Sequence, residues 1–176
     1  MPGAVLQVDT ALSLAGLEGR EQVMDNGCDV EKFELASADW FVFAQQRLDT
    51  LHARYSQLVG DEKFSMCEVY RNVPAHIAEG KDEIAWSFAF HNGRVGVEFR
   101  ERTDVDVWIS WKYAAIMPIA KAIYSDDAKA MADVARLRQT AEQNGDRLSR
   151  GDLSRVPPGI ARLLTELHND LAVHTL

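Results

Sequence analysis

The amino-acid sequence predicts an α+β domain in which a largely antiparallel sheet of about five strands is covered on one face by helices. Three observations lead to this class. An apolar stripe with helical spacing precedes several segments with alternating apolar side chains, turn residues separate these segments, and helical spacing returns after residue 111. Strands followed by helices, without regular alternation of the two, favour an α+β fold.

The acidic charge of the chain is concentrated near its N-terminus. The 176 residues have a formal net charge of −8, and residues 1–38 hold seven acidic residues against two basic ones. This segment has three glycines after residue 15 and no sustained apolar period. We therefore expect an acidic arm over residues 1–36, with one short strand near Ala4–Val8, and one domain over residues 37–176.

The composition also disfavours several classes of protein. A net charge of −8 gives nothing to drive the release of phosphate counterions, so we expect no nucleic-acid partner. No run of about 18 apolar residues could span a bilayer, and the first 20 residues lack the basic start of a signal peptide. We therefore expect a cytoplasmic protein without a transmembrane segment. Cys28 and Cys67 have no metal-ligand spacing, and a chain of this size needs no disulfide.

The first element of the predicted domain is a helix over residues 39–59. Ser37 suits its N-cap, Asp39 its first turn and Gly60 its C-terminal cap. Steps of three and four residues place one apolar stripe along this helix, formed by Trp40, Ala44, Leu48, Leu51, Tyr55 and Leu58. Such a stripe must pack on a broad apolar surface, which the next fifty residues supply.

Four strands are expected to follow, over residues 64–70, 84–91, 94–100 and 104–110. Asn92 and Gly93 form a strong hairpin signal between the second and the third, whereas Met66 and Cys67 blur the alternation of the first. Alternation places one set of side chains inward, namely Ile84, Trp86, Phe88, Phe90, Val95, Val97, Phe99, Val105, Val107 and Ile109. Short turns between consecutive strands predict an antiparallel sheet with one apolar face.

Helical spacing dominates the rest of the chain. One or two short helices over residues 113–124 are interrupted at Pro118, and Ser125 suits the cap of a helix over residues 126–144. The inward positions of that helix would be Met131, Val134, Leu137 and Ala141. A short edge strand over residues 147–153 precedes a last helix that opens at Pro157 and Pro158. Its apolar face holds Ile160, Leu163, Leu164, Leu167, Leu171 and Ala172.

No motif for catalysis, cofactor binding or metal binding is present. The sequence has no nucleophile elbow, phosphate-binding glycine loop or dinucleotide fingerprint, and no histidine pair has the spacing of a zinc site. We interpret the five histidines as surface or structural residues. Asp104 and Asp106 share one strand face and could form an acid–base pair, but solvated carboxylates partnered by neighbouring arginines are the better interpretation.

Large apolar side chains gather in one stretch of about forty residues. The group consists of Trp86, Phe88, Phe90, Phe99, Trp108, Trp111, Tyr113, Met117 and Tyr124. Each one alone is best interpreted as core, but together they can line a cavity between a curved sheet and short helices. The helix broken at Pro118 would be a natural lid, and Met66 and Met117 would let the cavity adapt its shape.

The order of these elements resembles the sterol carrier protein 2 superfamily of lipid-binding domains. The resemblance rests on the long first helix, the strands joined by Asn92–Gly93, residues 103–110 with an aspartate before alternating valines, and residues 145–152 ending in Gly-Asp. It covers roughly residues 37–176 and implies a noncatalytic tunnel between the sheet and the helices. By position, the ligand-binding residues implied are Trp86, Phe88, Val97, Phe99, Val107, Ile109, Ile116, Met117 and Ala120.

Three hypotheses for function follow. The first is binding, with transfer or presentation, of an apolar ligand such as a fatty acyl chain, a sterol or an aromatic hydrocarbon, with no cofactor. Arg100 or Arg102 would then hold a polar head group at the mouth of the tunnel. The second is a small hydratase, isomerase or cyclase that uses His91 or Asp104 in the pocket. The third is a dimerisation module in which the aromatic surplus lies at a homodimer interface.

Overall fold

The computed structural model describes residues 30–176, so the strand expected near Ala4–Val8 lies outside the described residues. It confirms the α+β class. The helices are α1 (Ala38–Val59), α2 (Ala75–Ala78), α3 (Tyr113–Ala120), α4 (Ala128–Gln143) and α5 (Pro158–His174), with a short 3₁₀ turn η1 (Leu153–Arg155). The strands are β1 (Phe64–Arg71), β2 (Glu83–His91), β3 (Arg94–Glu98), β4 (Val107–Lys112) and β5 (Arg147–Gly151).

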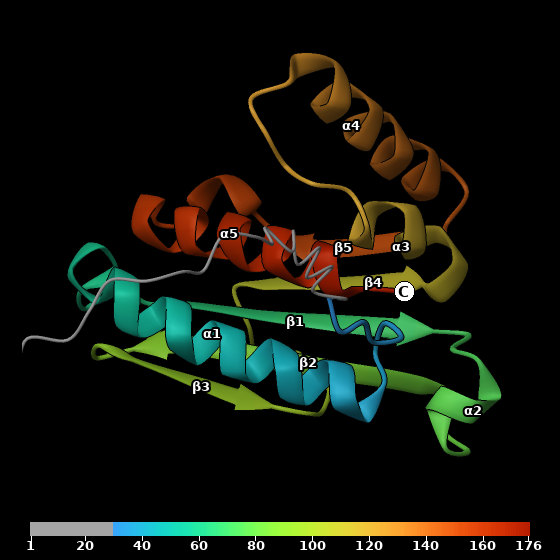
Figure 1. Ribbon diagram of the computed structural model, residues 1–176, viewed down its shortest axis with the longest axis horizontal. Helices are drawn as coiled ribbons and strands as arrows, with labels where there is room; N and C mark the ends of the chain where they lie inside the picture. The colour runs from blue at the N-terminus through green and yellow to red at the C-terminus, as the bar shows by residue number, and fades with distance from the viewer. Residues whose placement is uncertain (1–29) are drawn as a thin grey trace, which may run out of the picture.

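The five strands form one sheet in the order β3-β2-β1-β4-β5 (Figure 1). All neighbours are antiparallel except β1 and β4, which run parallel. The expectation of four consecutive antiparallel strands is therefore wrong at the fourth strand. It is also wrong about where that strand begins, because pairing starts at Val107 and not at Asp104.

The connection between β3 and β4 explains this difference. Residues 99–106 cross the back of the sheet from the β3 edge to β4 instead of turning back beside β3. The hydroxyl of Ser87 donates to the Arg100 carbonyl (3.4 Å), and the Arg102 amide donates to Cys67 Sγ (3.4 Å). Cys67 and Ser87 are consequently buried on the face opposite the main helices. Alternation alone does not distinguish a hairpin from such a crossing.

Helices α1 and α5 lie side by side on one face of the sheet (Figure 1). As expected, Ser37 caps α1 by accepting a hydrogen bond from the Trp40 amide (3.1 Å), and the Gly60 amide closes its end on the Ser56 carbonyl (2.9 Å). The predicted stripe is wrong at Leu58, which is 56% exposed. Val59, four residues after Tyr55, continues the stripe and is buried against the core instead.

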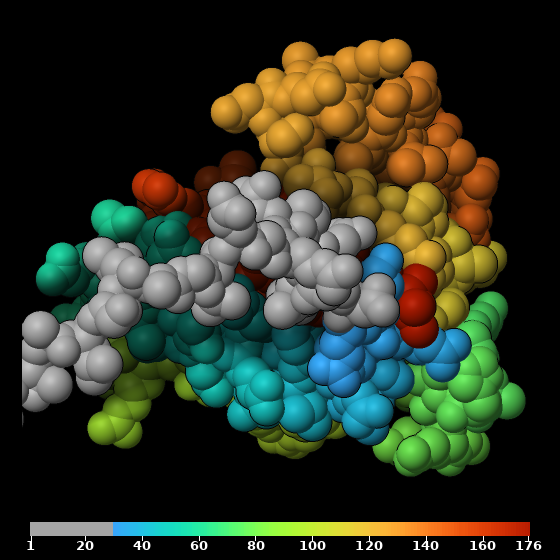
Figure 2. All heavy atoms as spheres, viewed as in Figure 1, coloured from blue at the N-terminus to red at the C-terminus, as the bar shows by residue number. Residues whose placement is uncertain are grey.

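Helix α4 stands apart from the layer formed by α1 and α5 (Figure 2). Its N-cap is Asp127 and not Ser125, because the Asp127 carboxylate accepts hydrogen bonds from the amides of Lys129 (2.8 Å) and Ala130 (3.2 Å). Val134 and Ala141 are buried as expected, but Leu137 is 40% exposed. A helix that buries so little of its apolar stripe forms a partial cover over its neighbours and contributes little to the core.

The last residues of the expected N-terminal arm contact the domain. The Phe33 amide donates to the His174 carbonyl (2.7 Å), and the Leu176 amide donates to the Phe33 carbonyl (2.9 Å). Leu35 and Ala36 are buried in the core. Within residues 30–176, no helix combines the length and the apolar character needed to cross a membrane. The division at residue 37 and the arm before it stay predictions.

Candidate functional site

A cavity of about 300 Å³ lies between the sheet and the helices that cover it. Its volume is at the lower end of the range of roughly 300–1,000 Å³ that small-molecule sites occupy. Most of its lining is apolar and comes from the segment before α1, from α1, α3 and α5, and from three central strands: Leu35, Trp40, Met66, Trp86, Phe88, Ile109, Trp111, Ile116, Ile119, Ala120, Leu164, Leu167 and Leu171. Polar side chains contribute at two places, described below.

Burial distinguishes the inner end of this cavity from its rim. We define the rim as Tyr124, Arg138, Leu153, Leu164 and His168, which are all partly or largely exposed. We call Trp40, Tyr70 and Trp86 the inner end, because they come from α1, β1 and β2, away from α4 and β5, and are at most 3% exposed. The rim side chains come from α4, α5, η1 and the connection before α4, so the cavity opens toward the side of the molecule where α4 stands.

The structure brings five of the nine predicted ligand-binding residues together in the cavity wall: Trp86, Phe88, Ile109, Ile116 and Ala120. Val107 is buried in the core but does not line the cavity. Val97 and Met117 are partly buried against the core and do not line the cavity either. Phe99 follows the end of β3, is 50% exposed and contacts Phe41 with ring centroids 5.3 Å apart. Its inward alternation is lost because the chain leaves the sheet at Glu98. A role of any of these residues in ligand binding stays a prediction.

Aromatic side chains from α1 and β2 shape the inner end of the cavity. The rings of Trp40 and Trp86 meet edge to face, with centroids 5.9 Å apart, and Trp86 packs against Phe88 at 5.3 Å. The indole nitrogen of Trp40 donates to the Thr175 hydroxyl (3.1 Å). Because that nitrogen is already bonded outside the cavity, Trp40 presents only apolar ring surface to the interior.

One carboxylate, that of Glu68, lies in this otherwise apolar inner wall. Glu68 belongs to the central strand β1, with Trp86 on β2 and Ile109 on β4 as its neighbours in the sheet. Its Oε2 accepts hydrogen bonds from the Tyr70 hydroxyl (3.0 Å) and the Trp86 indole nitrogen (3.2 Å). Burial raises the pKa of the Glu68 carboxyl above its ordinary value and raises that of the Tyr70 hydroxyl well above its own.

Two arginines form the second polar part of the wall. Arg138 of α4 donates to the Tyr124 hydroxyl, and its guanidinium lies 5.2 Å from the centre of the Tyr124 ring. Arg147 of β5 pairs with Glu142 and lies 5.2 Å from the centre of the Trp111 ring. Burial lowers the pKa of Arg147 from its ordinary value, and its Nε has no hydrogen-bond partner among the described residues. The cavity therefore has a cationic side near its rim.

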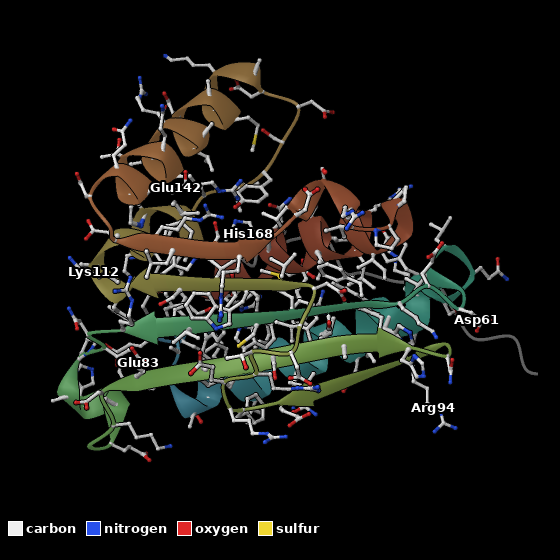
Figure 3. All side chains as sticks on the ribbon, turned by 180° about the vertical axis from the view of Figure 1, so that it is seen from behind. Asp61, Glu83, Arg94, Lys112, Glu142 and His168 are labelled. Carbon is white, nitrogen blue, oxygen red and sulfur yellow. The ribbon has the colours of Figure 1, made fainter. Side chains whose placement is uncertain are left out.

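His168 holds the rim in place. It lies on α5 beneath α4 (Figure 3), stacks on the Tyr124 ring with centroids 3.7 Å apart, and donates from Nε2 to the Ala122 carbonyl (2.8 Å). The neighbouring Asn169 exchanges two hydrogen bonds with the backbone of Tyr124. Burial lowers the pKa of His168 to about 4, so the ring is neutral at pH 7. The prediction of a structural histidine therefore agrees with its contacts.

The polar residues that the sequence suggests for the site lie outside this cavity. Arg102 pairs with Asp104 (2.6 Å) and Glu98 (3.2 Å) in the crossing connection, and Arg100 also pairs with Glu98 (2.5 Å). Arg100, Arg102 and Asp104 do not line the cavity, and neither does His91. Among residues 30–176, no cluster of three potential metal-ligating side chains occurs.

A signal for the missed carboxylate was nevertheless present. Phe64, Met66, Glu68 and Tyr70 are spaced by two residues, so Glu68 shares a strand face with three large side chains that belong to the apolar core. Arg138 and Arg147 offered no comparable signal, because their proximity to that carboxylate depends on where α4 and β5 lie.

Comparison with known proteins supplies likenesses of structure only. No protein-family model and no curated protein matches this chain. Similar solved structures include a sterol carrier protein 2, at 15% sequence identity, with 81% of this chain and 100% of that chain covered and a TM-score of 0.49.

Two further structures are comparably similar. One is a conserved hypothetical protein from Thermus thermophilus described as possibly a sterol carrier protein, at 15% identity, with 81% of this chain and 92% of that chain covered and a TM-score of 0.48. The other is a sterol carrier protein domain of Helicoverpa armigera, at 14% identity, with 83% and 98% covered and a TM-score of 0.45.

Proposed function

We propose that this protein binds a hydrophobic ligand, such as a fatty acyl chain or a sterol, in the cavity between the sheet and α1, α3 and α5, without catalysis. The observation that carries the proposal is the cavity of about 300 Å³ with a predominantly apolar wall. Each methylene group removed from water contributes about 0.8 kcal/mol, so a long chain needs few polar contacts to bind. Binding of this kind would suit transfer or presentation of the ligand by a cytoplasmic protein.

Filling the cavity should weaken binding. Ala120 lies in its wall on α3, and Ala120→Phe would place a ring where the ligand lies. Displacing about two methylene groups of ligand predicts roughly tenfold weaker binding. The measurement is displacement of the fluorescent fatty acid cis-parinaric acid by stearate. Ala114 is exposed on the same helix, so Ala114→Phe is the matched control and should bind like the wild type. Equal affinity of the two variants would contradict the proposal.

The charge near the rim favours a ligand with an anionic head group. Arg138 contacts the Tyr124 hydroxyl, and none of the ion pairs within residues 30–176 includes it, although its charge acts on the Glu68 carboxyl. This arginine takes the role that the sequence suggested for Arg100 or Arg102. The head group would remain near solvent while the hydrocarbon chain occupies the apolar interior.

Replacing this arginine should discriminate between charged and uncharged ligands. We expect Arg138→Gln to weaken stearate binding by about tenfold, because hydrogen bonds to charged groups contribute about 1.5–3 kcal/mol, and to leave methyl stearate unaffected. The control is Arg136→Gln on the same helix, since Arg136 is exposed and pairs with Asp133 on the surface. A similar loss for both ligands would instead indicate a general disturbance of α4.

A second candidate is acid–base catalysis on a hydrophobic substrate. The enzyme hypothesis in its first form needed His91 or Asp104 in the cavity, and both are exposed outside its lining. Glu68 favours a revised form, because a carboxyl group with a raised pKa in an apolar cavity suits proton transfer. Mass spectrometry of the ligand recovered after incubation separates the candidates: an unchanged ligand supports binding alone, whereas a converted one supports catalysis. A homodimer stays a prediction, to be tested by analytical ultracentrifugation.

A further inference from the structure

The Glu68 carboxylate is only half satisfied by the protein. Both hydrogen bonds that it accepts, from Tyr70 and from Trp86, end on Oε2. Within the part of the chain that the structure describes, no donor lies within hydrogen-bond distance of Oε1. The two donors also fix the orientation of the carboxyl group, because they hold one oxygen from different strands. Oε1 is therefore the acceptor that the wall offers to a bound molecule.

The surroundings of Glu68 make an accidental position hard to explain. Tyr70 on the same strand and the cross-strand neighbours Trp86 and Ile109 belong to the core, and Met66 packs against it. The charges of Arg138 and Arg147 act on the carboxyl but offset its burial only in part, because its pKa remains raised. A carboxylate is costly to place among such side chains unless both oxygens are hydrogen-bonded, and an apolar side chain of similar size would pack there without that cost. A ligand that donates a hydrogen bond to Oε1 would remove the deficit.

The position of this acceptor restricts the ligand further. Glu68 is hydrogen-bonded to Tyr70 and Trp86, which are at most 3% exposed, whereas the charges of Arg138 and Arg147 reach it from α4 and β5 on the other side of the cavity. A ligand whose only polar group is an anionic head at the rim would leave Oε1 facing hydrocarbon. The donor must therefore be carried on the part of the ligand that enters the cavity. Other carboxylates do not compete for it, because Glu68 is the sole acidic residue among the described lining residues.

We propose that Glu68 is a specificity residue whose Oε1 accepts a hydrogen bond from a hydroxyl group carried on the hydrocarbon body of the ligand. This inference rests on the proposed function and names the ligand class of the same cavity. The hydroxyl could belong to a hydroxylated fatty acyl chain or to a sterol, since both present one donor on an otherwise apolar body. A buried acceptor left unpaired penalises the ligand that lacks the hydroxyl, which produces selectivity rather than tighter binding of every lipid.

The test compares ligands that differ in one polar group. The probes are stearate, its 3-, 10- and 12-hydroxy derivatives, 12-oxostearate, and the pair cholesterol and cholestane, each as a competitor of cis-parinaric acid. We expect at least one hydroxylated ligand to bind about fivefold or more tightly than its unhydroxylated partner. The acyl and sterol pairs show which body carries the hydroxyl. A ketone can only accept, so 12-oxostearate should gain nothing over stearate.

The variant Glu68→Gln tests the assignment to this residue. Its amide oxygen can still accept from Tyr70 and Trp86, but its amide nitrogen now faces the cavity as a donor. The preference for the hydroxylated ligand over the ketone should therefore be lost or reversed. Glu62→Gln, on the exposed segment before β1, is the control and should retain the preference.

The outcomes separate this inference from the proposed function. Equal binding of hydroxylated and unhydroxylated partners by the wild type would overturn the inference and leave hydrophobic ligand binding intact. A hydroxyl preference that persists in Glu68→Gln would overturn the assignment to Glu68. Failure of every probe to displace cis-parinaric acid, or failure of the wild type to bind that acid, would overturn the proposed function and the inference with it.

Discussion

Replacing Gly151 with alanine is expected to lower the free energy of unfolding by about 2–4 kcal/mol. This glycine ends β5 with a φ of +91°, a backbone conformation that alanine adopts only with strain. A Cβ atom there would lie 2.0 Å from the Asp106 carbonyl oxygen and 3.0 Å from Val107 Cα. Both neighbours are backbone atoms at the start of β4, so the two strands would have to separate. Urea denaturation followed by circular dichroism measures the effect.

Gly96 provides the matched control for this prediction. It also lies in an edge strand, but a Cβ atom built on it has nothing within 4 Å, and its φ is not in the left-handed region. Gly96→Ala should therefore change the free energy of unfolding by no more than about 1 kcal/mol, and in the stabilising direction if anything. Two variants with the same loss of stability would show that the close approach of β5 to Asp106 does not limit the fold.

His168 is expected to make the folded protein sensitive to acid. Its folded-state pKa is lowered to about 4, chiefly because the partly buried ring, which stacks on Tyr124, is desolvated. The ordinary value, which applies to the unfolded chain, is about 6.5. Between these two values the unfolded state binds a proton that the folded state does not, so stability falls as the pH falls from about 6.5 to about 4. The loss of folding stability due to His168 is absent above pH 6.5 and reaches about 3 kcal/mol once the pH has fallen below about 4.

The variant His168→Phe isolates this contribution. Phenylalanine keeps a ring against Tyr124 but neither titrates nor donates to the Ala122 carbonyl, so at pH 7 we expect a loss of about 1 kcal/mol. Below pH 6.5 the variant should lose stability less steeply than the wild type, and the two curves should converge or cross. A variant curve parallel to that of the wild type would contradict the assignment.

The elements themselves were largely predictable because local signals determine them. Helix α1 begins at Ser37, whose side chain accepts a backbone hydrogen bond, and ends at Gly60, whose amide donates one. Pro158 begins α5, where its missing amide costs nothing. Alternation placed Trp86 and Phe88 on the covered face of β2 correctly. In each case the periodicity of apolar side chains or the capping residue depends only on neighbouring residues, so the element can be predicted without knowledge of distant segments.

Leu58 and Phe99 show where local signals fail. Both fit an apolar period, yet Leu58 is 56% exposed because the stripe shifts to Val59 in the last turn of α1, and Phe99 is 50% exposed because β3 ends at Glu98. A periodic pattern does not report where the covering layer stops. The same limit applies to residues 99–106, where alternation predicts the end of a hairpin and the start of a strand but the chain crosses the back of the sheet.

The sequence by itself determined the α+β class, the main helices and an apolar inner face rich in aromatic residues, because these depend on side-chain period and capping. Only the tertiary structure decided the parallel pairing of β1 with β4 and the polar groups of the cavity. Glu68, Arg138 and Arg147 come from β1, α4 and β5, and their proximity depends on long-range packing that leaves no trace in spacing. The apolar wall is a property of each strand, whereas the chemistry that would select a ligand arises from how those strands and α4 are assembled.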